Sequence, residues 1–300
     1  MDPFFVQLSL VPITVGVLAA ISCALPGNFL ILRGQALIGD AISHVVLPGI
    51  VVAFLITGTV STWPMLAGAG AAAALAVVLI ETIRRFGRVE AGAAMGVTFT
   101  TLFAGGVLLL EQSDTSSVHL DVEHALYGNL ESLIWLGGDS LSALFDPVAR
   151  ADLPPELARM ALVTLAIVAL TWVFWRPLVL STFDENHAQS LGLPTTVLSI
   201  GLVMTAAVAA VAAFDAVGSI LVIAMFICPP ATARLLTSRL THQVALSLIV
   251  AIASALGGYL IAGYGPLWLG FSASVSAAGM IATLSGLFLL AACLFGPQRR

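Results

Sequence analysis

An aspartate and a histidine stand four residues apart inside an otherwise apolar stretch of this sequence. They are Asp40 and His44, within the run RGQALIGDAISHVVLPG at residues 33–49. On a helix, residues at i and i+4 lie on one face with their side chains in reach of each other. A carboxylate oxygen and an imidazole nitrogen are also two ligands that divalent transition metals accept. The spacing therefore predicts a metal or proton site.

The sequence around Asp40 and His44 allows two interpretations of this pair, of which it favours one. Residues 16–32 and 45–56 carry no charged side chain. The plainer interpretation is a buried polar pair that only stabilises helix packing. Ionisable side chains within lipid are costly, however, and mostly line a cavity or an ion path. The functional interpretation is therefore favoured.

Two side chains do not complete the coordination shell of zinc or manganese, which takes four to six ligands. Asp215, within VAAFDAVGSI, is the other carboxylate well inside an apolar run. We expect it to be the third ligand, with the remainder supplied by a second subunit or by carboxylates that accompany the ion. We expect no permanently bound cofactor.

Composition identifies the class of protein. The 300 residues are 59% hydrophobic and 9% charged, with a mean hydropathy of +1.07. A soluble domain carries about 25% charged residues. The chain is therefore expected to be a multi-pass protein of the cell membrane, embedded in the lipid bilayer.

Missing motifs exclude several activities. The sequence contains no lysine, so a Walker A motif, which needs one, cannot occur. It also lacks HExxH and GxSxG motifs, so we expect the chain not to be an enzyme. No basic run suggests nucleic-acid binding.

Apolar stretches of about 20 residues predict an all-α membrane fold. Nine spans are expected, or eight if residues 201–236 form one span and a broken piece. We expect a single transmembrane domain over residues 1–300. The predicted spans are 9–32, 36–57, 64–83, 92–111, 159–179, 196–213, 215–235, 243–263 and 269–295.

Arginines flank the spans in a way that sets their orientation. Most of them fall on the cytoplasmic side if the N-terminus is outside. The connection 112–158 then lies outside, with a short interfacial or re-entrant helix expected over 122–136. It contains a polar cluster that is either a solvated acidic face, the favoured interpretation, or an electrostatic lure for cations at the outer mouth. Its members are His119, Asp121, Glu123 and His124.

Residues 181–194, STFDENHAQSLGLP, form a short polar segment between two spans on the inside. Composition alone leaves two interpretations open. The segment is either an ordinary cytoplasmic turn or a docking site for a soluble partner.

Five stretches in order resemble the membrane permeases of the zinc/manganese/iron branch of ABC importers. The resemblance covers almost the whole chain. The stretches are LRGQALIGDAISHVVLPGI, GRVEAGAAMGVTFTTLFAGGVLLL, LYGN, STFDENHAQSLGLP and VGSILVIAMFICPPATARLL.

The resemblance implies a fold, a function and partners. The fold would be that of an ABC importer permease, similar to the vitamin B12 importer. The chain would import Mn²⁺, Zn²⁺ or Fe²⁺ as its transported cation. Its partners would be cytosolic ATPase subunits, an extracytoplasmic metal-binding protein and a second permease protomer, expected to be another copy of this chain.

The resemblance also implies roles for residues. Asp40 and His44 fall on the family's intramembrane metal-contact positions. The loop that couples to the ATPase contains Phe183, Asp184, Glu185, Ala188 and Gly192. Asp215 has no such correspondence and rests on its position in the sequence.

Two other functions compete with this one. A stand-alone proton-coupled metal transporter would use Asp40, His44 and Asp215 as a proton relay. A permease for chelated iron or a vitamin is disfavoured, because a bulky organic ligand does not need a carboxylate–imidazole pair.

Overall fold

The structure is a computed structural model that describes residues 5–58, 62–112, 128, 130–138, 140, 143, 146–268, 270 and 275–297. Every regular element among these residues is a helix, as the all-α prediction requires. The elements are η1 (Val6–Leu10), α2 (Val11–Leu32), α3 (Ile38–Thr57), α4 (Thr62–Gly87), α5 (Ala91–Gln112), η2 (Leu130–Ser132), α7 (Pro147–Ala151), α8 (Pro155–Val173), α9 (Trp175–Phe183), α10 (Glu185–Ser190), α11 (Thr195–Leu236), α12 (Leu240–Trp268) and α13 (Ala277–Phe295).

Nine helical segments in the described part of the chain are long and apolar enough to cross a membrane, which confirms the larger predicted number. They are Val6–Leu32, Ile38–Thr57, Trp63–Arg84, Ala91–Leu109, Pro155–Val173, Thr195–Phe214, Ala216–Leu236, Leu240–Pro266 and Ala277–Phe295.

The fifth span ends earlier than predicted. The prediction ran from 159 to 179, whereas α8 ends at Val173 and α9 starts at Trp175. Pro177 explains the break, because it has no N–H for the carbonyl of Val173 and its ring would clash with that carbonyl in a continuous helix. The result is a short separate helix, α9.

The last span is shorter than predicted. Its predicted range was 269–295, whereas α13 begins at Ala277. The Ser276 hydroxyl caps the helix by accepting a hydrogen bond from the Gly279 N–H at 3.4 Å. A serine at this position satisfies a backbone donor that has no partner within the helix.

α11 is interrupted at Gly218, four residues after Phe214, where the predicted spans 196–213 and 215–235 meet. Gly218 has φ 75° and ψ 168°, which is not a helical conformation and which a residue with a Cβ rarely adopts. The kink therefore lies within the first residues of the second candidate span, Ala216–Leu236, and not between it and the first, Thr195–Phe214.

The interfacial helix predicted over 122–136 is wrong in its described part. Only Leu130–Ser132 is helical there, as one 3-10 turn, and residues 133–138 are not helical. Tertiary contacts hold the segment instead. The Trp135 N–H donates to the Gln7 carbonyl at 3.0 Å, and the Trp135 indole donates to the Ala149 carbonyl at 2.7 Å.

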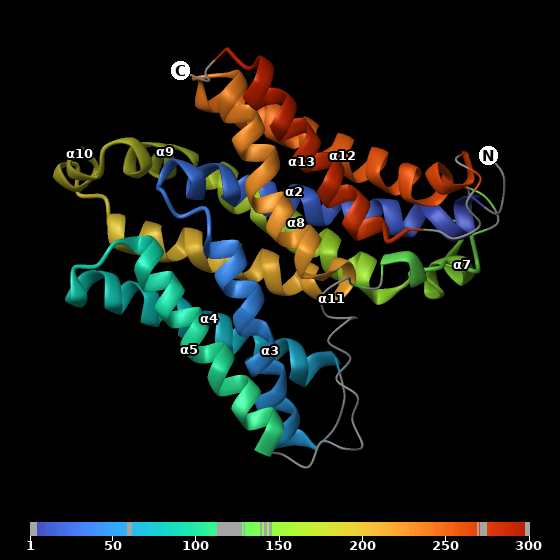
Figure 1. The fold of residues 1–300 in the computed structure, drawn as a ribbon, viewed down its shortest axis with the longest axis horizontal. Helices are drawn as coiled ribbons and strands as arrows, with labels where there is room; N and C mark the ends of the chain where they lie inside the picture. Colours follow the sequence, from blue (N-terminus) through green and yellow to red (C-terminus); the bar gives the residue numbers. More distant parts are fainter. Residues whose placement is uncertain are drawn as a thin grey trace. The chain divides into compact units, whose positions relative to one another are not determined.

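The chain divides into two compact units. Unit 1 comprises Met1–Leu25, Glu123–Val168 and Ala213–Arg300, and unit 2 comprises Pro26–Val122 and Ala169–Ala212. In unit 1, α12 and α13 pack side by side (Figure 1). A Cβ on Gly258 would lie 2.5 Å from the Ile281 Cα, so this crossing requires glycine.

Unit 1 also contains a close backbone approach at the kink of α11. A Cβ on Gly128 would overlap the backbone of Val217 and Gly218. Gly128 itself has φ +71°. The glycine of the LYGN sequence therefore packs directly on the non-helical residue of α11.

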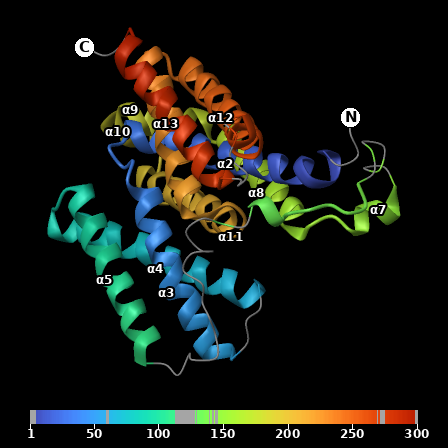
Figure 2. The same cartoon turned by 45° about the vertical axis from the view of Figure 1, so that its right-hand side comes forward.

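In unit 2, α3, α4 and α5 form a group of three mutually packed helices (Figures 1 and 2). α3 and α4 cross at Gly49 and Gly68, where a Cβ on either glycine would overlap the carbonyl oxygen of the other. α3 and α5 meet where Pro48 fills the space beside Gly106. Small residues permit this close approach, as is common between helices in lipid.

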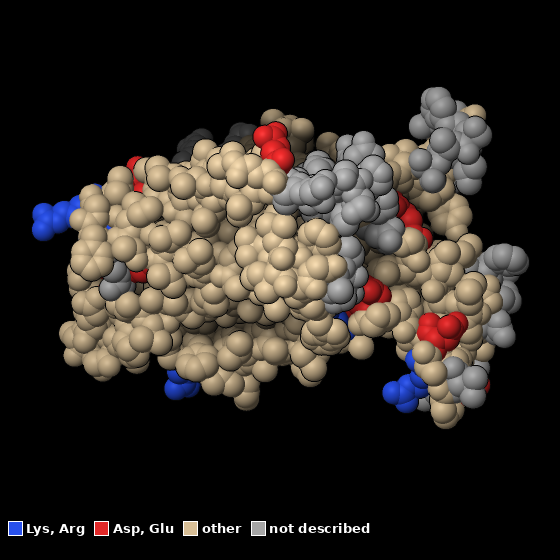
Figure 3. Space-filling view, turned by 90° about the horizontal axis from the view of Figure 1, so that it is seen from below, with Lys and Arg blue, Asp and Glu red and all other residues tan. Residues whose placement is uncertain are grey.

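Large apolar side chains cover much of the surface. Trp63 and Trp172 are both 81% exposed, and Phe86 is 87% exposed. Figure 3 shows one face on which charged side chains are few and widely spaced among uncharged ones. Such a surface suits lipid or a protein partner rather than water.

Gly68→Ala tests the α3–α4 crossing. The new methyl group would lie 2.6 Å from the Ala53 Cβ and would overlap the Gly49 carbonyl. We expect a loss of about 1–3 kcal/mol, as overpacked cores show, and a lower thermal unfolding midpoint of the purified protein in detergent.

Gly70→Ala is the matched control, because a Cβ there meets nothing within 4 Å. It should stabilise the helix by up to ~1 kcal/mol. If Gly68→Ala raises the thermal unfolding midpoint as Gly70→Ala does, α3 and α4 do not approach each other closely at Gly68.

Candidate metal site

The structure brings Asp40 and His44 together on α3. The His44 Nε2 lies 3.4 Å from the Asp40 Oδ1, and the two side chains are 43% and 31% exposed. Asp40 lies in the first turn of α3, where a carboxylate is favoured by the positive end of the helix dipole. No other residue of Ile38–Thr57 carries an acidic or basic side chain. The pair is therefore an isolated oxygen–nitrogen couple in an apolar helix.

Two aromatic rings of α5 hold the imidazole of His44. The Phe99 ring stacks on it with centroids 5.4 Å apart and an interplanar angle of 23°. The Phe103 ring meets it edge-on at 5.8 Å and 76°. A histidine ring turns easily about its last torsion. Walls on two sides therefore restrict the direction in which its nitrogens point.

The sequence did not single out Phe99 and Phe103. Phenylalanines in an apolar span read as ordinary lipid-facing or packing residues, and nothing in their spacing marks them. The signal lies between helices, because α3 and α5 must pack before the rings and the imidazole meet.

No group of three His, Cys, Asp or Glu side chains with metal-binding geometry occurs among the described residues. Asp215, the predicted third ligand, lies in α11 three residues before Gly218. Its side chain is outside what the structure describes, so its role stays a prediction. The predicted cation lure, His119, Asp121, Glu123 and His124, also lies outside the described residues.

The predicted coupling residues lie in a compact projection that joins α9, α10 and the start of α11. Phe183 ends α9 and Asp184 caps α10, with the Asp184 Oδ1 accepting a hydrogen bond from the His187 N–H at 2.8 Å. Glu185 begins α10, and Ala188, in the same helix, is fully buried. Gly192 has φ +79° and turns the chain toward α11.

Exposed apolar side chains flank this projection. Phe183 is 58% exposed and Leu191 is 60% exposed. The segment is therefore not a loose turn. It is a capped helix with an aromatic and an aliphatic side chain on its surface, which suits contact with another protein.

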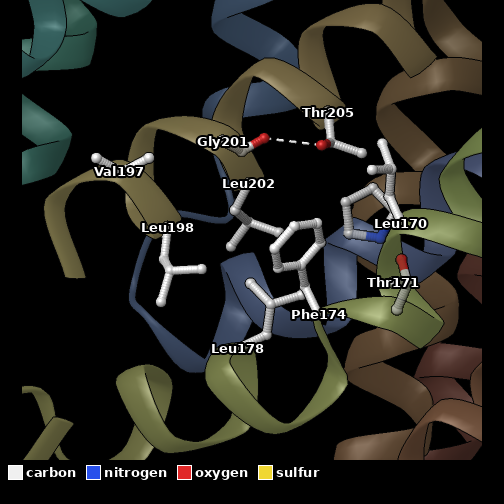
Figure 4. Close-up of a pocket in the computed structure, with 10 residues that line it drawn as sticks. Leu170, Thr171, Phe174, Leu178, Val197, Leu198, Gly201, Leu202 and Thr205 are labelled. Atoms are coloured by element: carbon white, nitrogen blue, oxygen red, sulfur yellow. Dashed lines mark hydrogen bonds between the residues drawn. The ribbon is translucent and has the colours of Figure 1, made fainter. Parts of the chain in front are cut away.

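A cavity of about 260 Å³ lies elsewhere in unit 2 (Figure 4). Its polar atoms include the hydroxyl of Thr205, which donates to the Gly201 carbonyl at 2.7 Å. It contains no carboxylate or imidazole, so it offers no metal ligand of the expected kind. Its lining residues are Pro26, Leu170, Thr171, Phe174, Leu178, Val197, Leu198, Gly201, Leu202 and Thr205.

Comparisons with known proteins identify the family of this chain. The sequence model of the ABC 3 transport family matches residues 6–134 and 149–296. The manganese transport system membrane protein MntD of Bacillus subtilis is 38% identical over 95% of this chain and 91% of its own length. The zinc transport system membrane protein TroD of Treponema pallidum is 34% identical over 95% of this chain and 73% of its own length.

A solved structure shares the fold. A chain of PsaBC from Streptococcus pneumoniae, in complex with Fab, superposes with a TM-score of 0.73 and 27% sequence identity. The match covers 97% of this chain and 92% of that chain. The similarity therefore extends over the whole membrane fold.

Phe99→Ala tests the aromatic walls. Removing the stacked ring frees the His44 imidazole to turn, so we expect the affinity of the purified protein for Mn²⁺ or Zn²⁺ to fall about tenfold, as when other groups that orient a ligand are lost. A competition titration with a chromophoric chelator measures it.

Phe86→Ala is the control, since that ring is 87% exposed at the end of α4. It should leave the affinity unchanged. Equal affinities in wild type and Phe99→Ala would show that the ring does not orient His44.

Proposed function

Because this chain belongs to the ABC 3 transport family, we propose that it is the membrane permease through which an ABC transport system imports a divalent transition-metal ion. Family membership and the nine apolar segments of the described residues make it a multi-pass protein of the cell membrane. The ion is the substrate, and Asp40 and His44 are its proposed contacts.

The separation of the two ligand atoms carries the proposal. Zinc binds imidazole nitrogen and carboxylate oxygen at about 2.1 Å. A 3.4 Å separation of Nε2 and Oδ1 then corresponds to an angle of about 108° at the ion, close to tetrahedral. The two atoms can therefore replace two waters of the ion without rearrangement of α3.

Further ligands must come from outside this pair. The same pair on a second copy of the chain would supply an oxygen and a nitrogen, which makes four ligands. Asp215 is the alternative source within one chain. An incomplete protein shell also suits transport, because a permeating ion must be released as well as bound.

ATP hydrolysis belongs to a separate subunit in this proposal. The chain has no lysine and hence no Walker A motif, so a P-loop that binds ATP must belong to another polypeptide. The exposed Phe183 and Leu191 around α10 would dock on the cytosolic ATPase. An extracytoplasmic binding protein would deliver the ion, and we expect no permanently bound cofactor.

The proton-coupled alternative is not favoured. The matching family is an ABC transport family, and the two relatives named above are membrane proteins of a manganese and a zinc transport system. The chain spans 91% of the length of the first of them. Their names specify manganese and zinc, and the sequence resembles the zinc/manganese/iron branch of ABC importers, so we propose the class of ion as Mn²⁺, Zn²⁺ or Fe²⁺. Competition among these ions in a reconstituted complex identifies the preferred one.

Asp40→Asn combined with His44→Ala tests the site. The variant lacks the anionic oxygen and the imidazole, so we expect ATP-driven uptake of Mn²⁺ or Zn²⁺ into proteoliposomes to be abolished. Copurification of the ATPase should persist.

Glu81→Gln is the matched control, since Glu81 forms a helical ion pair with Arg84 in α4 at 3.1 Å. Wild-type uptake is expected for it. Undiminished uptake in the double variant would remove Asp40 and His44 from the path.

Phe183→Ala tests the docking surface. Loss of an exposed ring at the base of α10 removes apolar contact area without disturbing the cap of that helix. We expect the amount of ATPase that copurifies to fall at least about tenfold, as at other aromatic interface positions. Leu162→Ala, which truncates a 70% exposed side chain of α8, is the control. Equal ATPase recovery from both variants would contradict docking at Phe183.

A further inference from the structure

Arg33 forms a two-point connection between the turn before α3 and the end of α9. Its Nε donates to the Thr182 Oγ1 at 3.0 Å, and its Nη2 donates to the Ser181 Oγ at 2.9 Å. Both hydroxyls in turn donate to the Leu178 carbonyl, at 2.6 Å from Thr182 and 3.2 Å from Ser181. Each hydroxyl therefore has its hydrogen directed into α9 and its lone pairs free to accept from the guanidinium.

The turn that carries Arg33 is tightly closed. Gly34 has φ +68° and donates to the Ile31 carbonyl at 3.1 Å, while the Gln35 N–H donates to the Leu30 carbonyl at 2.8 Å. This pair of hydrogen bonds is the Schellman arrangement that ends many helices. The Ile38 N–H then donates to the Gln35 carbonyl at 3.2 Å and starts α3. Because hydrogen bonds close this turn and connect it to α3, a shift of Arg33 also displaces the first turn of α3, which contains Asp40.

The other end of the connection adjoins the projection that carries α10. Ser181 and Thr182 directly precede Phe183, and Asp184 caps α10. A second contact holds α9 to the same part of α2, where the rings of Phe29 and Trp175 meet edge-on at 5.8 Å and 78°. Both ends of α9 are thus held by this region. Trp175 contacts Phe29 near the end of α2, and Ser181 and Thr182 bind Arg33 in the turn that follows.

Charges around Arg33 fit a partly buried, permanently cationic connector. Burial lowers the pKa of its guanidinium, the Glu185 carboxylate of α10 opposes this shift, and Arg84 of α4 adds to it. Arginine keeps its charge in proteins. Glu185, the first residue of α10, therefore stabilises the charged Arg33 side chain that donates hydrogen bonds to α9.

We infer that Arg33 is a positioning residue that transmits movement of the α9–α10 projection to the part of α3 that carries Asp40 and His44. The inference rests on the proposed function, in which the ATPase docks on that projection and the ion contacts that pair. The guanidinium is the element that links the two, because it binds α9 through two hydrogen bonds and belongs to the rigid turn that starts α3.

The test uses the complete transporter reconstituted in proteoliposomes with its ATPase. The measured quantity is the number of metal ions imported per ATP hydrolysed. In Arg33→Gln we expect the ATPase to copurify and to hydrolyse ATP, while metal imported per ATP falls at least about fivefold, the lower range of coupling between sites.

Two further variants separate coupling from folding. Ser181→Ala with Thr182→Val removes the acceptors and leaves Arg33 in place, so it should reproduce the loss of coupling. Arg33→Lys keeps the charge and one hydrogen bond, and it should restore coupling in part. Arg176→Gln, at an exposed arginine of α9, is the control with a wild-type ratio.

Distinct outcomes overturn the inference and the function. A wild-type ratio in Arg33→Gln, or a loss that always accompanies a lower unfolding midpoint and a lost ATPase, overturns the role of Arg33. If Arg33→Gln does not fold, a wild-type ratio in Ser181→Ala with Thr182→Val overturns it. Absence of ATP-driven metal uptake in the wild-type complex instead refutes the proposed function.

Discussion

The cost of an ionisable side chain in lipid is the constraint on which the rest of this structure depends. α3 contains one carboxylate and one imidazole, and both lie on the same helix face with their nearest atoms 3.4 Å apart. The helix sets the distance between them, and the rings of Phe99 and Phe103 limit the orientation of the imidazole. Helix geometry and aromatic packing together place the Asp40 oxygen and the His44 nitrogen side by side in a span where ionisable side chains are costly.

The same unit contains the projection that would meet a soluble partner. The turn between α2 and α3 connects this projection to α3, because Arg33 donates two hydrogen bonds to α9 and the residues after Arg33 begin α3. A movement of the α9–α10 projection can therefore reach the helix that carries Asp40 and His44. A permease powered by another polypeptide needs such a physical link between the place of ATP hydrolysis and the place of ion binding.

Most of the fold was predictable, because apolar length and helical spacing act locally. The nine spans and the Asp40–His44 contact follow from those two features. The misplaced ends of the fifth and last spans depend on single residues, Pro177 and Ser276, whose effects outweigh average hydropathy. The aromatic walls and the Arg33 contacts were not predictable, because they join positions that are 55 to 149 residues apart and exist only once helices have packed.

The crossing at Gly49 and Gly68 limits how the protein can change state. Turning α3 about its own axis would bring the side chain of a neighbouring residue into a gap that has no room even for a methyl group. Pro48 against Gly106 blocks the same rotation on the side of α5. The three helices must therefore move as a rigid body, and Asp40 and His44 with them. Flexion then falls to places where the helical hydrogen-bond ladder is already interrupted, such as Pro26 within α2 and Gly218 within α11.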